Sequence, residues 1–388
     1  MRLLFATSIV PDGMLASGYE IANAAIIDAL RRAGADVTVI GFTWPDRSPA
    51  DPDNTLVVGA LDVRTQNAGL RTKLVWLAKA LKTGLTFASA KLLVVPDEAI
   101  RARIRDAGPF DGYILNSVQF VAAFEAVLAD RPSIFVAHNV EYRSAEENAA
   151  ASSGLERWLF RREARLLKIL EARLCRKAHF VFTLAQDDRA PLGVADDRKS
   201  AVLPLVTMRT VPAKTSRAIA CDAALIGTWT WQPNRIGLDW FLEKVVPHLP
   251  GTFRVRIAGN IPQGMSSSHP GVEFVGRVPD ARAFVRSGAV VPLISTAGSG
   301  VQLKTIETFE LGLPSVATSR SLRGIGYRPV NCVVTDDPVA FANGLAAAAK
   351  APRDADGAAF HASQLKALDA AVARGLATLT ARRQEVGA

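Results

Sequence analysis

The sequence predicts an α/β protein with two tandem doubly wound domains, at 1–205 and 217–360. The chain has 388 residues, more than a single hydrophobic core usually serves. In both halves short apolar runs alternate with helical patterns, an arrangement typical of parallel sheets. A polar and basic stretch at 208–216 reads as the linker between the halves.

The opening of the chain predicts a βαβ unit. Leu3–Thr7 is a short β-type run, and the loop at 8–18 contains proline and glycine. Apolar residues then recur at helical spacing from Ile21 to Leu30, and Gly34 supplies a stop signal. Val37–Ile40 follows as the next buried strand. Such a unit starts a parallel sheet.

The rest of the first half continues this design, with one less orderly stretch. At 56–105 basic residues mix with leucine, valine and aromatic residues, and the pattern is too irregular to assign elements. Further strands are predicted at Tyr113–Leu115, Ile134–Val136, Phe180–Thr183 and Ala201–Leu203.

The second half repeats the alternation. Helical patterns at 237–245 and 281–285 lie between apolar runs. An alanine-rich helical pattern at about 361–388 ends the chain, and we expect it to pack back on the first domain. Strands are predicted at Ala223–Ile226, Arg254–Ala258, Val272–Val275, Ala289–Leu293, Ser315–Ala317 and Cys332–Val334.

The composition of the chain indicates which classes of partner and which cellular compartment to expect. The net charge of +9 suits an anionic partner: nucleic acid, a phosphorylated small molecule or an acidic lipid surface. The basic residues form no aromatic-interleaved platform, so we do not expect nucleic acid. The sequence shows no signal peptide and no membrane span, and its three scattered cysteines fit a reducing compartment. We expect a cytoplasmic protein that can rest on the inner face of the plasma membrane.

The clearest chemical signal is a small-residue loop that leads into a helix. Ala297-Gly298-Ser299-Gly300 follows an apolar strand and precedes Lys304 and Glu307. Glycines let main-chain N–H groups approach a phosphate, and the start of a helix adds positive potential. The loop is not a Walker loop, because the Gly-Lys-Ser/Thr ending is absent. The alternative interpretation is an ordinary glycine-rich turn with a surface Lys–Glu pair.

Several motifs together resemble a known family. They are Leu225-Ile226-Gly227, Trp231-Gln232-Pro233-Asn234, Ile257-Ala258-Gly259, Gly271-Val272-Glu273-Phe274-Val275-Gly276 and the stretch 298–314. The second half is similar to retaining glycosyltransferases of family 4, and the first half agrees more loosely, through its opening loop and His138-Asn139-Val140-Glu141-Tyr142. The resemblance implies the GT-B fold: two Rossmann-like domains that face each other across a cleft.

The resemblance also implies roles for individual residues. Glu307 matches the second glutamate of the family's Glu-x7-Glu motif and would hold the donor ribose. Lys304 and the amides of the Gly298–Gly300 loop would hold the diphosphate, and Arg277 would lie near the base. His138 would lie near the donor sugar. The predicted catalytic residues are His138, Lys304 and Glu307. The predicted donor-binding residues are Lys304 and Glu307 together with Gly18, Gly227, Asn234, Arg277, Gly298, Ser299 and Gly300. The predicted acceptor-side residues are Asn116, Ser117 and Glu141.

This chain departs from the family pattern in two places. Ser299 stands where the first glutamate of the motif would be, and 229–234 replaces a region that often carries an arginine and a lysine. The donor must therefore be held differently, which makes Arg235 and Arg323 candidates.

The predicted reaction is transfer of a hexose-type sugar from a nucleoside diphosphate to a growing bacterial polysaccharide or a glycolipid. No Asp-x-Asp pair suggests a metal-bridged diphosphate, so we expect neither metal nor cofactor besides the sugar nucleotide. The resemblance implies retention, by same-face attack of the acceptor. Two alternatives stay open: a nucleotide-sugar epimerase of the same fold, and a non-catalytic binder of nucleotide sugars.

One helix suggests a further partner. Residues 157–168 form a basic amphipathic pattern, and 72–91 offers similar material. These segments are either solvated basic faces or places where the first domain rests on an anionic membrane.

Overall fold

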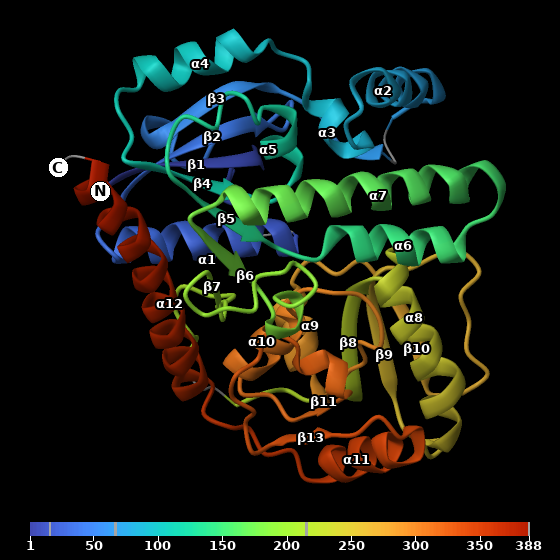
Figure 1. The fold of residues 1–388 in the computed structure, drawn as a ribbon. Coiled ribbons are helices and arrows are strands. Elements are labelled where there is room, and N and C mark those ends of the chain that lie inside the picture. The colour runs from blue at the N-terminus through green and yellow to red at the C-terminus, as the bar shows by residue number, and fades with distance from the viewer. Residues whose placement is uncertain (15–16, 66–67, 214–215, 387–388) are drawn as a thin grey trace. The chain divides into compact units, whose positions relative to one another are not determined.

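The computed structural model describes residues 1–14, 17–65, 68–213 and 216–386 (Figure 1). Unit 1 comprises Met1–Leu203 and Ala367–Ala388, and unit 2 comprises Pro204–Lys366. Each unit holds one parallel sheet, which confirms the predicted α/β class. The stretch expected as the linker, 208–216, lies within unit 2, and residues 214–215 lie outside the described residues.

The sheet of unit 1 has seven parallel strands in the order β3-β2-β1-β4-β5-β6-β7. The strands are β1 (Arg2–Ile9), β2 (Asp36–Thr43), β3 (Thr55–Ala60), β4 (Gly112–Asn116), β5 (Ser133–Ala137), β6 (Phe180–Thr183) and β7 (Ser200–Val202). The chain order reverses between β1 and β4, which makes their carboxyl ends the switch point where doubly wound sheets bind ligands.

The helices of unit 1 are α1 (Gly18–Arg32), α2 (Leu70–Thr83), α3 (Phe87–Leu92), α4 (Asp97–Asp106), α5 (Gln119–Ala123), α6 (Glu141–Ala151) and α7 (Gly154–Lys177). The sequence indicates the start of α1, because Ser17 and Glu20 form a reciprocal capping box. The irregular stretch 56–105 contains β3 and α2–α4. Its apolar pattern is irregular because α2 buries only Ala80 among its residues and β3 is half-buried at the sheet edge.

Unit 2 repeats the architecture. Its six strands have the order β10-β9-β8-β11-β12-β13, so its switch point lies between β8 and β11. All six predicted strands are confirmed, as β8 (Cys221–Thr228), β9 (Val255–Asn260), β10 (Val272–Gly276), β11 (Gly288–Leu293), β12 (Ser315–Ala317) and β13 (Cys332–Val334). The helices are α8 (Gln232–Trp240), α9 (Ala281–Arg286), α10 (Leu303–Glu310) and α11 (Pro338–Lys350).

The last helix, α12 (Gly357–Val386), starts in unit 2 and continues in unit 1 from Ala367. Within unit 1, Arg32 donates to Asp369 at 2.6 Å. Gly375 lies against the ring of Phe182 on β6, where an added Cβ would come within 2.3 Å of the ring. The helix is therefore tied to both α1 and the sheet of unit 1.

Candidate functional site

A pocket opens at the switch point of unit 2. Its lining includes Leu225 and Ile226 of β8 and Val291–Leu293 of β11. Lys304 and Glu307, both on α10, are the charged residues of its lining. The two residues are three positions apart on α10, so their side chains share one helix face.

Lys304 places its ammonium against an aromatic wall. The Nζ atom lies 4.9 Å from the ring centroid of Trp229, and the Trp229 indole N–H donates to the Ala258 carbonyl at 2.8 Å. A Cβ at Gly227 would lie 2.9 Å from Nζ and 2.8 Å from the Trp229 ring, so this position favours glycine. The Lys304 residue is exposed overall, but its amine lies in the crevice between Trp229 and Gly227.

The electrostatics of this lysine fit an anion site. Loss of hydration lowers the Lys304 pKa to about 8, although the nearby Glu307 carboxylate acts in the opposite direction. Arg282 pairs with Glu307 at 2.7 Å. Because that arginine already balances the glutamate, the Lys304 charge remains available for an added anion.

The loop before α10 turns its carbonyl groups to one side. Arg323 donates to the carbonyls of Gly298 and Ala297, and Arg320 also donates to that of Gly298, at 3.3 Å. In a planar trans peptide the following N–H points the opposite way, so the amides of Gly298 and Ser299 face away from the arginines. Across the described chain, the N–H groups of residues 297–301 donate no hydrogen bond.

One feature of the backbone and one of the side chains make this loop suitable for an anion. Gly298 and Gly300 have φ angles of 84° and 75°, in the left-handed region that glycine favours. Such turns gather successive N–H groups into a concave anion-binding surface. The hydroxyl oxygens of Thr296 and Ser299 are buried without a partner among the described residues. Arg323 thus positions the loop, and Ser299 offers an unused hydroxyl.

Of the other residues predicted on the donor side, some line the pocket and some do not. Asn234 lines the pocket and donates to the Thr228 carbonyl at 3.1 Å. Arg277 is exposed after Gly276 and is not among the residues that line the pocket. Arg235, one of the candidates for compensating the missing glutamate, pairs with Asp239 at 2.7 Å instead.

Unit 1 carries a second polar cluster, at its own switch point. The amide nitrogen of Asn116, at the end of β4, donates to Asn23 at 2.9 Å and to Thr7 and Tyr19 at 3.3 Å. Tyr19 and Thr7 join their hydroxyl groups at 2.7 Å. The Asn116 carbonyl oxygen lies 2.8 Å from His138 Nε2. These five side chains form one connected network.

His138 is held as a neutral imidazole. Burial lowers its pKa to about 4, so it carries no charge near neutral pH. Since the Asn116 amide nitrogen donates to Asn23, its oxygen accepts from His138, which assigns the ring proton to Nε2. The Nδ1 atom is then a hydrogen-bond acceptor.

Ser117 and Glu141 belong to a neighbouring group. Ser117 has a φ of 67°, unusual for a residue with a side chain, and its hydroxyl donates to Gln119. The Glu141 side chain bonds Gln119 and Asn139, and burial raises its pKa. Gln119 therefore links the two predicted acceptor-side residues, whereas Asn116 contacts His138 directly.

Sequence reasoning missed Thr7, Tyr19 and Asn23. The available signal was the pair Tyr19 and Asn23, four residues apart, since the buried Asn23 interrupts the apolar face of α1. Gly18 is the first residue of α1, directly before Tyr19. The opening loop at 8–18, which contributes to the family resemblance, includes residues 15–16, which lie outside the described residues.

Among the described residues, no group of three or more His, Cys, Asp or Glu side chains is arranged to hold a metal ion. None of the described helices combines the length and apolar character needed to span a bilayer.

Solved structures of other proteins share this two-unit α/β architecture. Sucrose-phosphate synthase from Thermosynechococcus elongatus is 14% identical, with 100% of this chain and 99% of that chain covered and a TM-score of 0.60. Anabaena Alr3699/HepE in complex with UDP and glucose is 13% identical, with 100% and 99% covered and a TM-score of 0.56. At these identities the likeness shows the fold. A search among curated proteins finds no relative of similar sequence.

A family match adds sequence evidence for unit 2. Residues 220–350 match the family described as glycosyl transferases group 1, a segment that contains the pocket with Lys304 and Glu307. The match supports glycosyl transfer as the activity. The chain has the fold of the GT-B glycosyltransferases, and its residues 220–350 are similar to the glycosyl transferases of group 1.

Proposed function

We propose that the protein transfers a sugar from a nucleoside diphosphate to a glycan or lipid-linked acceptor, with retention, in bacterial surface polysaccharide synthesis. One observation carries the proposal: the Lys304 ammonium lies beside Gly227 and Trp229 in a pocket at a sheet switch point. This pocket lies within the segment that matches group 1 glycosyl transferases.

The donor diphosphate is assigned to the loop and α10. As the bond between sugar and phosphate breaks, negative charge grows on the diphosphate. Lys304 and the loop amides at Gly298–Gly300 would stabilise that charge, because preformed donors need no reorganisation during the reaction. Glu307 would accept from the ribose hydroxyls, with Arg282 holding the carboxylate in place. Contact of Arg277 with the base stays a prediction.

The sugar and acceptor hydroxyls are assigned to the polar cluster of unit 1. Neutral His138 can accept a hydrogen bond from a sugar hydroxyl through Nδ1, because Asn116 occupies Nε2. Asn116 would act as the positioning residue for His138. Ser117 and Glu141, joined through Gln119, remain candidates for the acceptor side.

Retention follows from attack on the face that the diphosphate leaves. The acceptor oxygen forms a bond to the anomeric carbon while the bond from that carbon to the phosphate oxygen breaks. The acceptor proton passes to the departing phosphate oxygen. This route uses Lys304 and the loop amides for charge stabilisation and needs no enzymatic nucleophile or bound metal.

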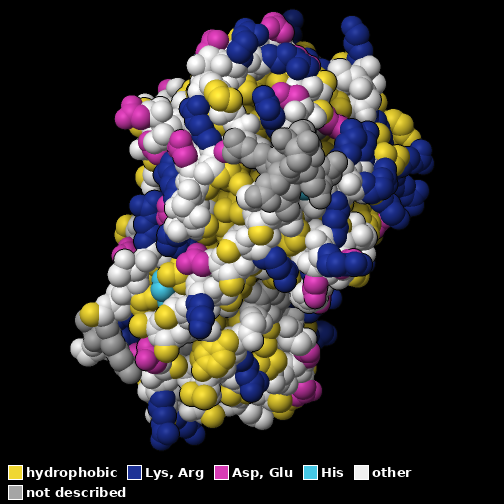
Figure 2. All heavy atoms as spheres, turned by 60° about the vertical axis from the view of Figure 1, so that its left-hand side comes forward, with side chains coloured by type: hydrophobic (Ala, Val, Ile, Leu, Met, Phe, Trp, Pro, Cys, Tyr) yellow, Lys and Arg dark blue, Asp and Glu magenta, His cyan; other side chains and the backbone are white. Residues whose placement is uncertain are grey.

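Membrane contact belongs to the same proposal. Helix α2 exposes Leu70, Leu74 and Leu81 together with basic Arg71 and Lys82, a combination suited to an anionic lipid surface. Figure 2 shows hydrophobic side chains beside clusters of Lys and Arg on one face of the molecule. Failure to bind anionic vesicles at low salt would remove this part of the proposal while leaving the reaction unaffected.

Thermal stabilisation by nucleoside diphosphates tests the donor site. A ligand that binds only the folded state raises the melting temperature, and the UDP named in the Anabaena structure makes UDP the first compound to try. We expect stabilisation of the wild type, loss of it in Lys304→Ala and Glu307→Ala, and its retention in Lys244→Ala, which removes an exposed lysine elsewhere in unit 2. A panel of nucleoside diphosphates that leaves a folded wild type unshifted contradicts the donor-site assignment.

A further inference from the structure

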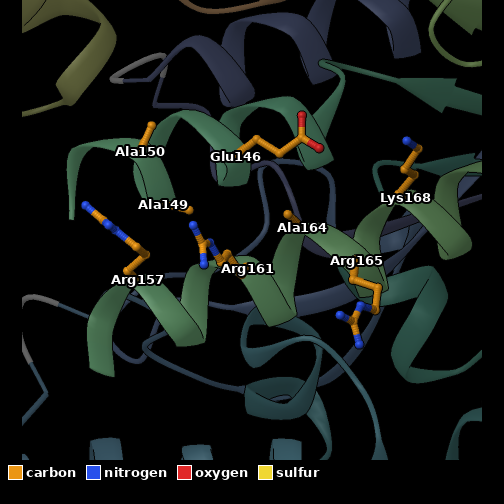
Figure 3. Close-up of a pocket in the computed structure, with 8 residues that line it drawn as sticks. All are labelled: Glu146, Ala149, Ala150, Arg157, Arg161, Ala164, Arg165 and Lys168. Atoms are coloured by element: carbon orange, nitrogen blue, oxygen red, sulfur yellow. The ribbon is translucent and has the colours of Figure 1, made fainter. Parts of the chain in front are cut away.

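The helical hairpin α6–α7 of unit 1 contains a groove outside the polar cluster described above. The methyl groups of Ala149 and Ala164 lie in it, and Arg157, Arg161, Arg165 and Lys168 line it along α7. Figure 3 shows Arg161 reaching toward α6, with Arg157 and Lys168 toward the two ends and Arg165 turned away from α6. The groove is therefore long, basic and shallow.

The charges of this groove repeat at a regular interval. Arg157, Arg161 and Arg165 are each four residues apart, so they share one helix face with one cation per turn, about 6 Å apart. Together with Lys168 they extend over about 17 Å of helix. Like charges at this spacing repel one another, so this row of cations destabilises α7 unless an anion binds to it.

Carboxylates of the protein do not neutralise this row. Among the described residues, no salt bridge involves any of the four cations. On α7 itself, Glu163 pairs with Arg162, and Glu171 accepts from the first amides of α6. Glu146 is the single acidic side chain in the groove lining. The row therefore keeps a clear surplus of positive charge toward solvent.

The direction of the groove connects it with the polar cluster of unit 1. Helix α6 begins three residues after His138. Helix α7 runs back along α6, because the Lys168 ammonium lies 5.3 Å from the ring of Tyr142 in the first turn of α6. The row of cations thus starts near the switch point of the sheet and leads away from it toward Arg157.

We infer that this groove binds an acidic glycan, the growing acceptor chain of the proposed transfer. A linear chain with repeated carboxylates or phosphates matches cations placed once per helical turn. A single-stranded nucleic acid has similar charge, but its bases usually stack on aromatic side chains, and no aromatic residue lines the groove among the described residues. The inference rests on the proposed function, since it names the acceptor of the same reaction.

The test measures binding of an oligoglucuronate, with a neutral glucan oligosaccharide and oligo-deoxythymidine of similar length for comparison. The variant is Arg161→Gln/Arg165→Gln, because neither side chain has another partner that would make it necessary for folding in the described structure. The control is Arg103→Gln/Arg176→Gln, which removes the same charge from exposed positions on α4 and α7 outside the groove.

We expect the wild type and the control to bind the oligoglucuronate alike, and the groove variant to bind it at least about tenfold more weakly. The neutral oligosaccharide should not bind. Equal binding by the groove variant, an equal loss in the control, or oligo-deoxythymidine binding as tightly as the oligoglucuronate would each overturn the inference.

A second readout separates this inference from the proposed function. The groove variant should keep its thermal stabilisation by a nucleoside diphosphate, because the donor pocket is in unit 2. Absence of that stabilisation in the wild type contradicts the proposed function. A wild type that is stabilised by the nucleoside diphosphate but binds the oligoglucuronate no better than the groove variant does overturns the groove inference alone.

Discussion

Binding of a nucleoside diphosphate should weaken above about pH 8, where Lys304 loses its proton. Loss of hydration in the pocket lowers the pKa of this lysine from 10.5 to about 8. A bound diphosphate adds negative charge beside the ammonium and favours the protonated form. Binding near pH 8 should therefore take up about half a proton per site, a quantity that titration calorimetry in buffers of different ionisation enthalpy measures.

The size of the effect follows from the kind of contact that Lys304 makes. A hydrogen bond to a charged group contributes about 1.5–3 kcal/mol, so Lys304→Met should weaken binding roughly 10- to 150-fold at pH 7. The wild-type affinity should be constant below pH 8 and then fall about tenfold per pH unit until it approaches that of Lys304→Met. Lys244→Met, with an exposed lysine removed, should behave as the wild type.

The stability of the ligand-free protein should change in the opposite direction. A lysine whose pKa is lower in the folded state binds fewer protons there, so stability rises with pH between about 8 and 10.5. Below pH 8 the unfavourable charge is fully present, and Lys304→Met removes it. The variant should melt higher than the wild type at pH 7. A lower melting temperature, or a wild-type to variant affinity ratio that does not depend on pH between 7 and 10, would refute this reasoning.

The remaining predictions concern stability and site geometry. Gly227→Ala should displace the Lys304 ammonium, because the added Cβ would lie 2.9 Å from Nζ. Nucleoside diphosphate binding should then weaken about tenfold in a calorimetric titration. Unchanged affinity would contradict the position of the ammonium beside Gly227. Gly375→Ala should lower the free energy of unfolding by about 1–3 kcal/mol in urea, since its Cβ would lie 2.3 Å from the Phe182 ring, and a neutral effect would mean that α12 does not pack there. Burial raises the Glu171 pKa to about 8, so the free energy of unfolding of the wild type should fall as pH rises from 4.5 to 8. Glu171→Gln should abolish this pH dependence. An identical pH dependence in the variant would exclude Glu171 as its source.

The fold of unit 2 could be predicted because its central strands contain continuous apolar runs. Strands such as β11 are buried along their whole length, and parallel strands buried on both faces leave that pattern in the sequence. Edge strand β3 is only half-buried, and α2 turns most of its apolar side chains to solvent, so neither has the expected periodicity.

The candidate site could be predicted where its residues are close in sequence. Lys304 and Glu307 share a helix and lie after a glycine loop, so local spacing was sufficient. The role of Arg323 in holding the Gly298 carbonyl depends on a tertiary contact across 25 positions. The network around Asn116 likewise joins segments 93 positions apart, which no local pattern encodes.

Glycosyl transfer itself is tested most directly by incubating the protein with the sugar nucleotide chosen by thermal stabilisation and an acidic oligosaccharide, and recording the product by NMR. The predicted result is acceptor-dependent release of the nucleoside diphosphate, with the new linkage keeping the anomeric configuration of the donor, and loss of both in Lys304→Ala. Donor binding without any transfer would identify a non-catalytic binder, and an inverted linkage would contradict same-face attack.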